Sequence, residues 1–212
     1  MNIAVIGASG KAGSLIVAEA LERGHNVLAI VRDQSKITDP RVKVLEKDLF
    51  ALTYEDIKDS EVVIDAFAAW TPDTLNLHQT SLQHLSDVVS GKENRLLVVG
   101  GAGSLYVDAA HTIQLMDTPD FPDSFKPLAS NMGKALEALR SRDDVRWTYL
   151  SPAADFQADG KRSGRYSAGG EELILNAKQE TVISYADYAI AMIDEAEQAN
   201  HVQERFSVVG EA

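Results

Sequence analysis

The fold of this chain is indicated most directly by the stretch Ile3-Ala4-Val5-Ile6-Gly7-Ala8-Ser9-Gly10-Lys11-Ala12-Gly13. An apolar run leads into glycines spaced G-x-x-G-x-x-G, and apolar residues then recur at helical spacing as far as Gly24. Strand, glycine turn and helix in this order form the context in which a glycine fingerprint binds a dinucleotide. Glycines let the backbone approach a pyrophosphate closely, and free N–H groups at the helix start face the anion. The alternative is a glycine-rich turn that holds no ligand.

Composition limits the class of protein. The chain has 212 residues, 45% of them hydrophobic, and a net charge of −12. This length suits one domain, residues 1–212, with a substantial core. The acidic balance argues against a nucleic-acid partner, because such a surface needs clustered Lys and Arg. It also means that an anionic cofactor must be held by helix dipoles and a few placed cations.

Location and metal binding can also be judged from the sequence. No apolar run reaches the roughly 18 residues of a membrane span, and the first strand begins without a signal-peptide pattern. We therefore expect a cytoplasmic protein with no membrane partner. The chain has no cysteine, which excludes disulfides and thiolate metal sites. Because no histidine spacing such as H-E-x-x-H occurs, we expect no metal.

Strands and helices are predicted to alternate through the first two thirds of the chain. This alternation predicts an α/β fold, a Rossmann-like doubly wound parallel sheet with helices on both faces. The expected strands are 3–6, 26–31, 42–46, 61–65, 95–99 and 146–150, with helices following 13, 53, 72 and 128.

A small C-terminal elaboration is expected from residues 151–212. The polar stretch 155–170 is consistent with a mobile substrate loop. Residues 173–175 and 181–183 could form a small hairpin, and a capping box at Ser184-Tyr185-Ala186-Asp187 predicts a helix to about Ala199. A strand at 205–209 ends the chain.

The end of the second strand bears on the choice of cofactor. In NAD-binding units this position usually carries Asp or Glu, which binds the ribose hydroxyls. Arg32 offers a guanidinium instead, which suits a 2′-phosphate. The sequence therefore favours NADP, while Asp33 leaves NAD open. Ser35 and Lys36 could add phosphate contacts, although a plain polar turn explains them almost as well.

Several motifs, taken together, resemble the atypical short-chain dehydrogenases/reductases, in the branch of NmrA-like proteins and flavin or biliverdin reductases. The resemblance covers nearly the whole chain. It rests on Gly7-x-x-Gly10-x-x-Gly13, Val31-Arg32-Asp33, Lys47-Asp48-Leu49, Trp147-Thr148-Tyr149-Leu150-Ser151-Pro152 and Ile183-Ser184-Tyr185-Ala186-Asp187-Tyr188-Ala189.

This resemblance implies where the cofactor lies. Asp48, which could instead be a turn cap, and Leu49 would lie beside the adenine. The candidate cofactor contacts are the phosphate neighbours Gly7, Ser9, Gly10, Lys11, Ala12 and Gly13; Ala66, Phe67 and Ala68 at the adenosine ribose and diphosphate; Gly100 and Gly101 at the nicotinamide ribose; and Ser151, Pro152 and Ala153 at the nicotinamide.

The catalytic dyad of the family is the main departure. Short-chain dehydrogenases usually carry Tyr-x-x-x-Lys, in which the tyrosine donates a proton. Here Lys134 fits the lysine position, but Ser130 stands where the tyrosine would be. A serine hydroxyl is far less acidic than a phenol, so the usual carbonyl reduction is not expected. Lys134 either holds the nicotinamide ribose or is an ordinary solvated lysine, and His111 and Tyr106 are the remaining candidate proton donors.

Reduction of a flavin, a quinone or a similar electron-poor acceptor requires the fewest catalytic groups from such a site. The cofactor supplies the hydride and water can supply the proton. FMN or another flavin is then a small-molecule substrate, whose ring would stack on the nicotinamide. An NmrA-like sensor of NADP(H) fits the missing tyrosine equally well, and a sugar-nucleotide epimerase or dehydratase is less favoured. Candidate lining residues are Phe67, Trp70, Tyr106, His111 and Phe156. The oligomeric state is left open.

Overall fold

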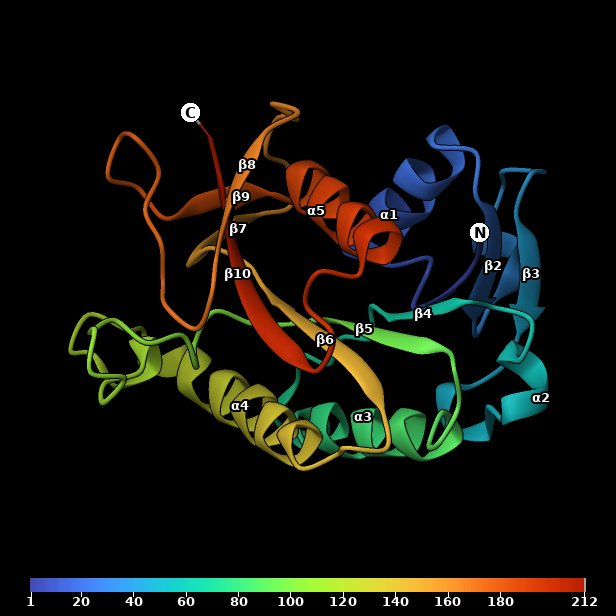
Figure 1. Ribbon diagram of the computed structural model, residues 1–212, viewed down its shortest axis with the longest axis horizontal. Helices are drawn as coiled ribbons and strands as arrows, with labels where there is room; N and C mark the ends of the chain where they lie inside the picture. The colour runs from blue at the N-terminus through green and yellow to red at the C-terminus, as the bar shows by residue number, and fades with distance from the viewer. Residues whose placement is uncertain (212) are drawn as a thin grey trace.

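The computed structural model describes residues 1–211 and is built on an eight-stranded sheet (Figure 1). The strand order is β3-β2-β1-β4-β5-β6-β10-β8, and every pairing is parallel except that of β8 with β10. This confirms the predicted Rossmann-like sheet. The strands are β1 (Asn2–Ile6), β2 (Asn26–Val31), β3 (Lys43–Glu46), β4 (Val62–Asp65), β5 (Arg95–Val99), β6 (Arg146–Ser151), β8 (Tyr166–Gly169) and β10 (Glu204–Gly210).

Helices cover both faces of the sheet (Figure 1). Successive residues of a strand point to opposite faces, so Ile3 and Val5 join one apolar core while Ala4 and Ile6 join the other. The first core is closed by α1 (Lys11–Glu22) and α5 (Tyr185–Gln198). The second core is closed by α2 (Tyr54–Ile57), α3 (Leu77–Val88) and α4 (Lys126–Arg140).

The strand order reverses at β1. From β1 the chain passes through α1 to β2 on one side, whereas β4 lies on the other side of β1. Open α/β sheets bind their ligands outside the strand ends at this kind of reversal. The glycine turn after β1 therefore lies where a dinucleotide would be bound.

The C-terminal elaboration differs from the prediction in two places. The expected loop 155–170 contains β7 (Asp155–Gln157) and β8. The expected hairpin is wrong, because β9 (Val182–Ser184) pairs in parallel with β7 and residues 173–175 form no strand. Asn176 explains the turn, since its side-chain oxygen accepts hydrogen bonds from the amides of Lys178 and Glu180. Ile183 is buried beside Phe156 in the parallel pair.

Only half of the expected capping box forms at α5. The Ser184 hydroxyl accepts a hydrogen bond from the Asp187 amide at 3.0 Å. The Asp187 carboxylate does not reach back to Ser184 but accepts bonds from the amides of Ser163 and Gly164, each at 2.9 Å. A side chain expected to cap a helix locally therefore anchors the segment between β7 and β8.

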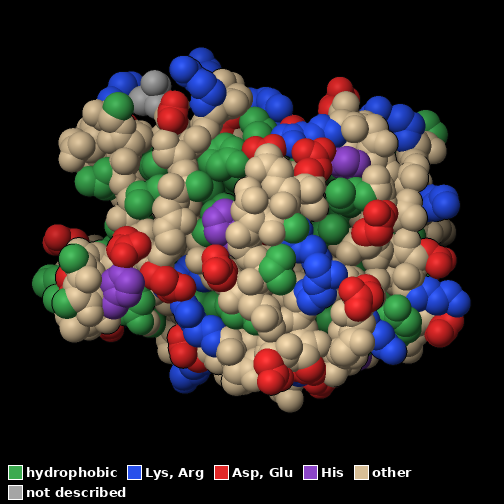
Figure 2. Space-filling view, in the orientation of Figure 1, with side chains coloured by type: hydrophobic (Ala, Val, Ile, Leu, Met, Phe, Trp, Pro, Cys, Tyr) green, Lys and Arg blue, Asp and Glu red, His purple; other side chains and the backbone are tan. Residues whose placement is uncertain are grey.

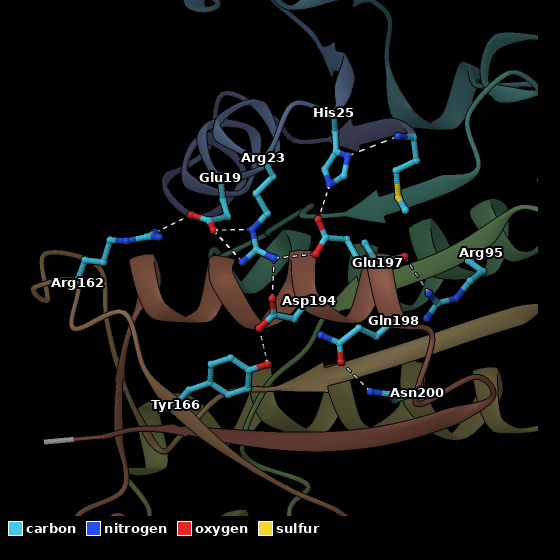
Figure 3. A network of polar contacts seen from close by, with 12 residues as sticks. Glu19, Arg23, His25, Arg95, Arg162, Tyr166, Asp194, Glu197, Gln198 and Asn200 are labelled. Carbon is cyan, nitrogen blue, oxygen red and sulfur yellow. Dashed lines mark hydrogen bonds and ion pairs between the residues drawn. The ribbon is translucent and has the colours of Figure 1, made fainter.

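A polar network joins the C-terminal ends of α1 and α5 (Figure 3). Arg23 lies at its centre and binds Glu19 at 2.8 Å, Asp194 at 2.6 Å and Glu197 at 2.9 Å. Glu19 also pairs with Arg162 at 2.6 Å, which ties the segment after β7 to α1. Because these side chains are only partly exposed, the network fixes how the two helices lie against each other.

Candidate functional site

The glycine turn between β1 and α1 is shaped for an anion. Gly7 has φ of +72°, and a Cβ there would lie 2.6 Å from the Ala66 carbonyl oxygen. The turn closes with a 2.9 Å bond from the Gly10 amide to the Gly7 carbonyl. No side chain caps α1 at Gly10, and no acidic residue stands in its first turn. The amides at the helix start are thus left for a ligand, which fits the pyrophosphate of a dinucleotide.

The predicted phosphate neighbours differ in accessibility. Ser9, Gly10 and Lys11 are exposed, Ala12 is half-buried and Gly13 is buried beneath the turn. A Cβ on Gly13 would overlap the Gly7 carbonyl oxygen, so Gly13 allows the helix to begin directly on the turn. The exposed residues can meet a ligand, whereas Gly13 acts through packing.

Arg32 stands exposed just beyond the end of β2. It makes no ion pair within residues 1–211, in contrast to Arg41, which binds Asp39 at 2.6 Å. Asp33 accepts bonds from the Ser35 hydroxyl at 2.6 Å and from the Ser35 amide at 3.1 Å, which hold the pKa of the Asp33 carboxyl below its ordinary value. The Ser35 hydroxyl is therefore occupied, whereas Arg32, like the exposed Lys11 and Lys36, makes no ion pair within residues 1–211 and remains available for a phosphate.

Asp48 caps a turn, which was the alternative interpretation of this residue. One carboxylate oxygen accepts a 2.9 Å bond from the Phe50 amide and caps the short 3₁₀ turn Leu49–Ala51. The side chain is exposed, and its second oxygen has no hydrogen-bond partner in the described residues. Leu49 is buried. The local cap and a contact with a ligand are compatible, because they use different oxygens.

The segment after β4 is held by two polar side chains, the buried Asp65 and the half-buried His78. Asp65 accepts a 3.0 Å bond from the Phe67 amide, and His78 bonds the backbone of Ala69. Burial raises the pKa of Asp65 to about 6 and lowers the pKa of His78, which therefore stays neutral near pH 7. Ala66 and Phe67 are half-buried and Ala68 is exposed. These backbone bonds fix the segment expected to border the adenosine.

A small cavity of about 20 Å³ lies behind this segment, between the sheet and helices α3 and α4. Asp65, His78, Ser81 and Tyr149 contribute polar atoms to its wall. The Ser81 hydroxyl is buried without a hydrogen-bond partner in residues 1–211. Burial also raises the pKa of Tyr149 to about 12. The cavity has room for one water molecule, which would satisfy the serine.

The turn after β5 is shaped by Tyr149. A Cβ on Gly100 would overlap the Tyr149 ring, and the Gly101 amide donates to the Tyr149 hydroxyl at 3.3 Å. Beside it, Ser151, Pro152 and Ala153 at the end of β6 are buried. The Ser151 hydroxyl has no partner within the described chain. A buried hydroxyl without a partner is uncommon in proteins. Ser151 is fully buried, so this hydroxyl lies beneath the surface where the nicotinamide was expected.

The structure does not bring Ser130 and Lys134 to this turn. The face of α4 that meets it is formed by Ala129, which packs near Gly103, and Met132, which packs near Gly101. In a helix of 3.6 residues per turn, Ser130 and Lys134 lie roughly 160° around from Met132. Lys134 is exposed. The i, i+4 spacing matches the family dyad, but this arrangement gives no support to a catalytic pair.

His111 lies in an exposed turn with φ of +54°. Its ring stacks on Tyr106, with ring centroids 4.6 Å apart, and binds Glu172 at 2.6 Å. Asp108 shapes the turn by accepting bonds from the amides of Thr112 and Ile113. His111 is thus held by Tyr106 and Glu172, which form an isolated bridge outside the strands of the sheet.

Loops gather at the carboxyl ends of the strands. At the left of Figure 2 the surface is hollowed between an upper and a lower lobe, where Figure 1 shows these loops.

None of the helices in residues 1–211 is both long and apolar enough to cross a membrane.

Sequence reasoning assigned no role to three residues of this region. Asp65 was placed only within an apolar strand, although a carboxylate at the end of such a strand was a usable signal. Tyr149 and Tyr185 were placed only within expected secondary structure and family motifs. The neighbours of Tyr185 come from separate parts of the chain, so no local pattern could have identified it.

Comparison with known proteins agrees with this architecture. A family model described as NAD(P)H-binding matches residues 7–199. The uncharacterised Bacillus subtilis protein YwnB is 53% identical over 213 residues, covering 100% of both chains. A Streptococcus pneumoniae structure, named as a candidate NADH-flavin reductase, is 47% identical with a TM-score of 0.96 over 100% of each chain. A Lactobacillus casei structure is 30% identical with a TM-score of 0.91, again over 100% of each chain. These similarities confirm the resemblance inferred from the motifs.

Proposed function

We propose that this chain, which belongs to the NAD(P)H-binding family, is an oxidoreductase that uses NADPH to reduce a flavin, a quinone or a similar electron-poor acceptor. The observation that carries the proposal is the uncapped start of α1, placed on the Gly7 turn at the strand-order reversal. The amides there and the helix dipole favour a pyrophosphate, even though the net charge of the protein is −12.

Arg32 supports the preference for NADPH. The amides at the start of α1 would hold the pyrophosphate, and Arg32 would hold the 2′-phosphate at the end of β2. The free oxygen of Asp48 would accept from the adenine amino group. Ser151, which is fully buried, would lie beneath the nicotinamide. In the described chain, the Ser151 hydroxyl has no hydrogen-bond partner, and one of the two Asp48 carboxylate oxygens has none.

The proposed type of acceptor follows from the missing tyrosine proton donor. Ser130 stands where the family carries its tyrosine, and Ala129 and Met132 are the α4 residues nearest the turn after β5. We therefore infer that residues 1–211 offer no Tyr-Lys dyad of the family type there. NADPH would supply a hydride to the acceptor, and water would supply the proton. Electron-poor rings such as flavins and quinones accept hydride without a protein acid. The name given to the Streptococcus pneumoniae relative supports the same choice.

A titration followed by turnover tests the proposal. Purified protein is titrated with NADPH and with NADH, and FMN or a quinone is then added while the absorbance of the reduced nucleotide is followed. We expect tighter binding of NADPH and faster loss of NADPH once an acceptor is present. Binding without turnover would indicate that the protein is a sensor of NADP(H) and not a reductase. Failure to bind either nucleotide would overturn the proposal.

A further inference from the structure

Three aromatic rings form a ladder that starts beneath the end of β6. The Tyr188 hydroxyl donates to the Leu150 carbonyl at 2.7 Å, and the same oxygen accepts from the Gly100 amide at 2.9 Å. The Phe156 ring lies 4.8 Å from the Tyr188 ring, and the Tyr185 ring lies 4.0 Å from Phe156. Tyr188 is fully buried, whereas Phe156 and Tyr185 are half-buried. The ladder thus runs from the junction of β5 and β6 to the surface.

The exposed end of the ladder lies at the same edge of the sheet as the glycine turn. Helix α1 begins where β1 ends, and α5 leads into β10, which runs parallel to the other central strands. Both helices therefore run from the carboxyl edge towards the amino edge. The ion pairs of Arg23 with Asp194 and Glu197 join their C-terminal ends and confirm the common direction (Figure 3). Tyr185, the first residue of α5, then lies at the edge where α1 begins.

The two outer rings are held by fixed structure. Phe156 stands opposite Ile183 in the parallel pair of β7 and β9, so its position is set by the backbone. The segment after β7 is anchored twice, by Asp187 bonding the amides of Ser163 and Gly164 and by Arg162 pairing with Glu19. A preorganised ring binds a partner ring with less loss of entropy than a mobile one.

The Tyr185 hydroxyl is available to a ligand. It makes no hydrogen bond within residues 1–211, and burial raises the pKa of Tyr185 above its ordinary value. The phenol is therefore protonated near pH 7 and can donate. A half-buried ring pair with an unused donor presents both a stacking face and a polar handle.

We propose that Phe156 and Tyr185 form the platform on which the planar ring of the acceptor stacks, with the Tyr185 hydroxyl donating to that ring. This inference rests on the proposed function and adds the residues that select an aromatic acceptor. The platform follows directly from the end of β6, whose residues 151–153 were expected beside the nicotinamide. Offset or edge-to-face aromatic contacts stabilise a pair by about 0.5–1.5 kcal/mol beyond burial.

Substitution of each ring tests the platform. Tyr185→Leu and Phe156→Leu are expected to raise the KM for FMN about tenfold, the upper end of what such a contact provides. The KM for NADPH should stay within about twofold. Tyr185→Phe should retain most of the affinity for FMN because it keeps the ring. Tyr54→Leu, a half-buried tyrosine in α2 far from these strands, is the control, and thermal unfolding confirms that each variant is folded.

The possible outcomes separate the two proposals. An unchanged KM for FMN in either leucine variant, or an equal loss with FMN and with NADPH, would overturn the platform. If the wild-type protein turns over no acceptor, the reductase proposal fails, and FMN binding is then read from quenching of flavin fluorescence. Quenching by the wild type that disappears in the leucine variants would still support the platform. No quenching by the wild type would overturn it.

Discussion

A Cβ atom added to Gly13 would overlap the carbonyl oxygen of Gly7. The first turn of α1 therefore rests directly on the glycine turn, and the amides that would bind the pyrophosphate are positioned by this contact. The same carbonyl accepts the bond from the Gly10 amide that closes the turn. The spacing of the glycines is thus a packing requirement as well as a means of letting a phosphate approach.

Gly13→Ala is expected to weaken NADPH binding at least tenfold. Alanine favours a helix over glycine by about 1 kcal/mol, but its Cβ would push α1 away from the turn and misplace the amides. Fluorescence titration with NADPH measures the Kd. Gly24→Ala is the control, because φ is +78° there and no atom lies within 4 Å of the added Cβ. It should reduce stability by about 1–2 kcal/mol and leave the Kd unchanged. An unaltered Kd in Gly13→Ala would contradict this account of the turn.

Arg32→Asp is expected to shift the preference from NADPH towards NADH. The substitution removes the cation proposed for the 2′-phosphate and introduces a carboxylate that binds ribose hydroxyls. The ratio of Kd values for the two nucleotides should change by at least tenfold. Lys58→Asp makes the same change of charge at the amino edge of the sheet, where Lys58 pairs with Glu55, and should leave the ratio unchanged. An unchanged ratio in Arg32→Asp would remove the argument for NADPH.

Asp65→Asn should alter how stability depends on pH. Burial raises the pKa of Asp65 from 3.8 to about 6. Between these values the folded state binds more protons than the unfolded state, so the free energy of unfolding falls as pH rises, by roughly 3 kcal/mol in total. Asparagine keeps an acceptor for the Phe67 amide and has no charge. Relative to wild type, the variant should therefore gain stability from pH 4 to pH 6 and hold that gain above. Urea unfolding across this range measures it; a difference that does not vary with pH would count against the buried carboxylate.

Arg23→Ala should destabilise the fold by about 2 kcal/mol, because it leaves three carboxylates facing one another at the ends of α1 and α5. Glu19, whose side chain is only 7% exposed, would keep its pair with Arg162, whereas Asp194 would lose the cation it pairs with. Lys58→Ala removes an exposed pair and should cost less than about 1 kcal/mol. Thermal or urea unfolding compares the two variants. Equal losses would show that the network contributes no more than an ordinary surface pair.

Several site predictions depended on what the sequence can encode locally. The glycine turn and the exposed Arg32 follow from the order of residues along the chain, and the structure places them together because adjacent parallel strands end at one edge. Ser130 and Lys134 matched a spacing, but spacing does not say which face of a helix meets the site. Packing of Ala129 and Met132 against the turn after β5 decides that. One oxygen of the Asp48 carboxylate accepts a hydrogen bond from the nearby Phe50 amide, which the resemblance to the family did not predict.

The sequence alone was enough to predict a mainly parallel sheet with helices on both faces and a glycine turn directly after its first strand. Apolar strands alternating with amphipathic helices can bury both faces of a sheet in few other ways. The tertiary structure decided the C-terminal part. There β9 pairs with β7 instead of with residues 173–175, and Asp187 binds a segment more than twenty residues away. The rings of Phe156, Tyr185 and Tyr188 meet through that pairing. Contacts between distant segments depend on how whole elements pack, which no local pattern of residues specifies.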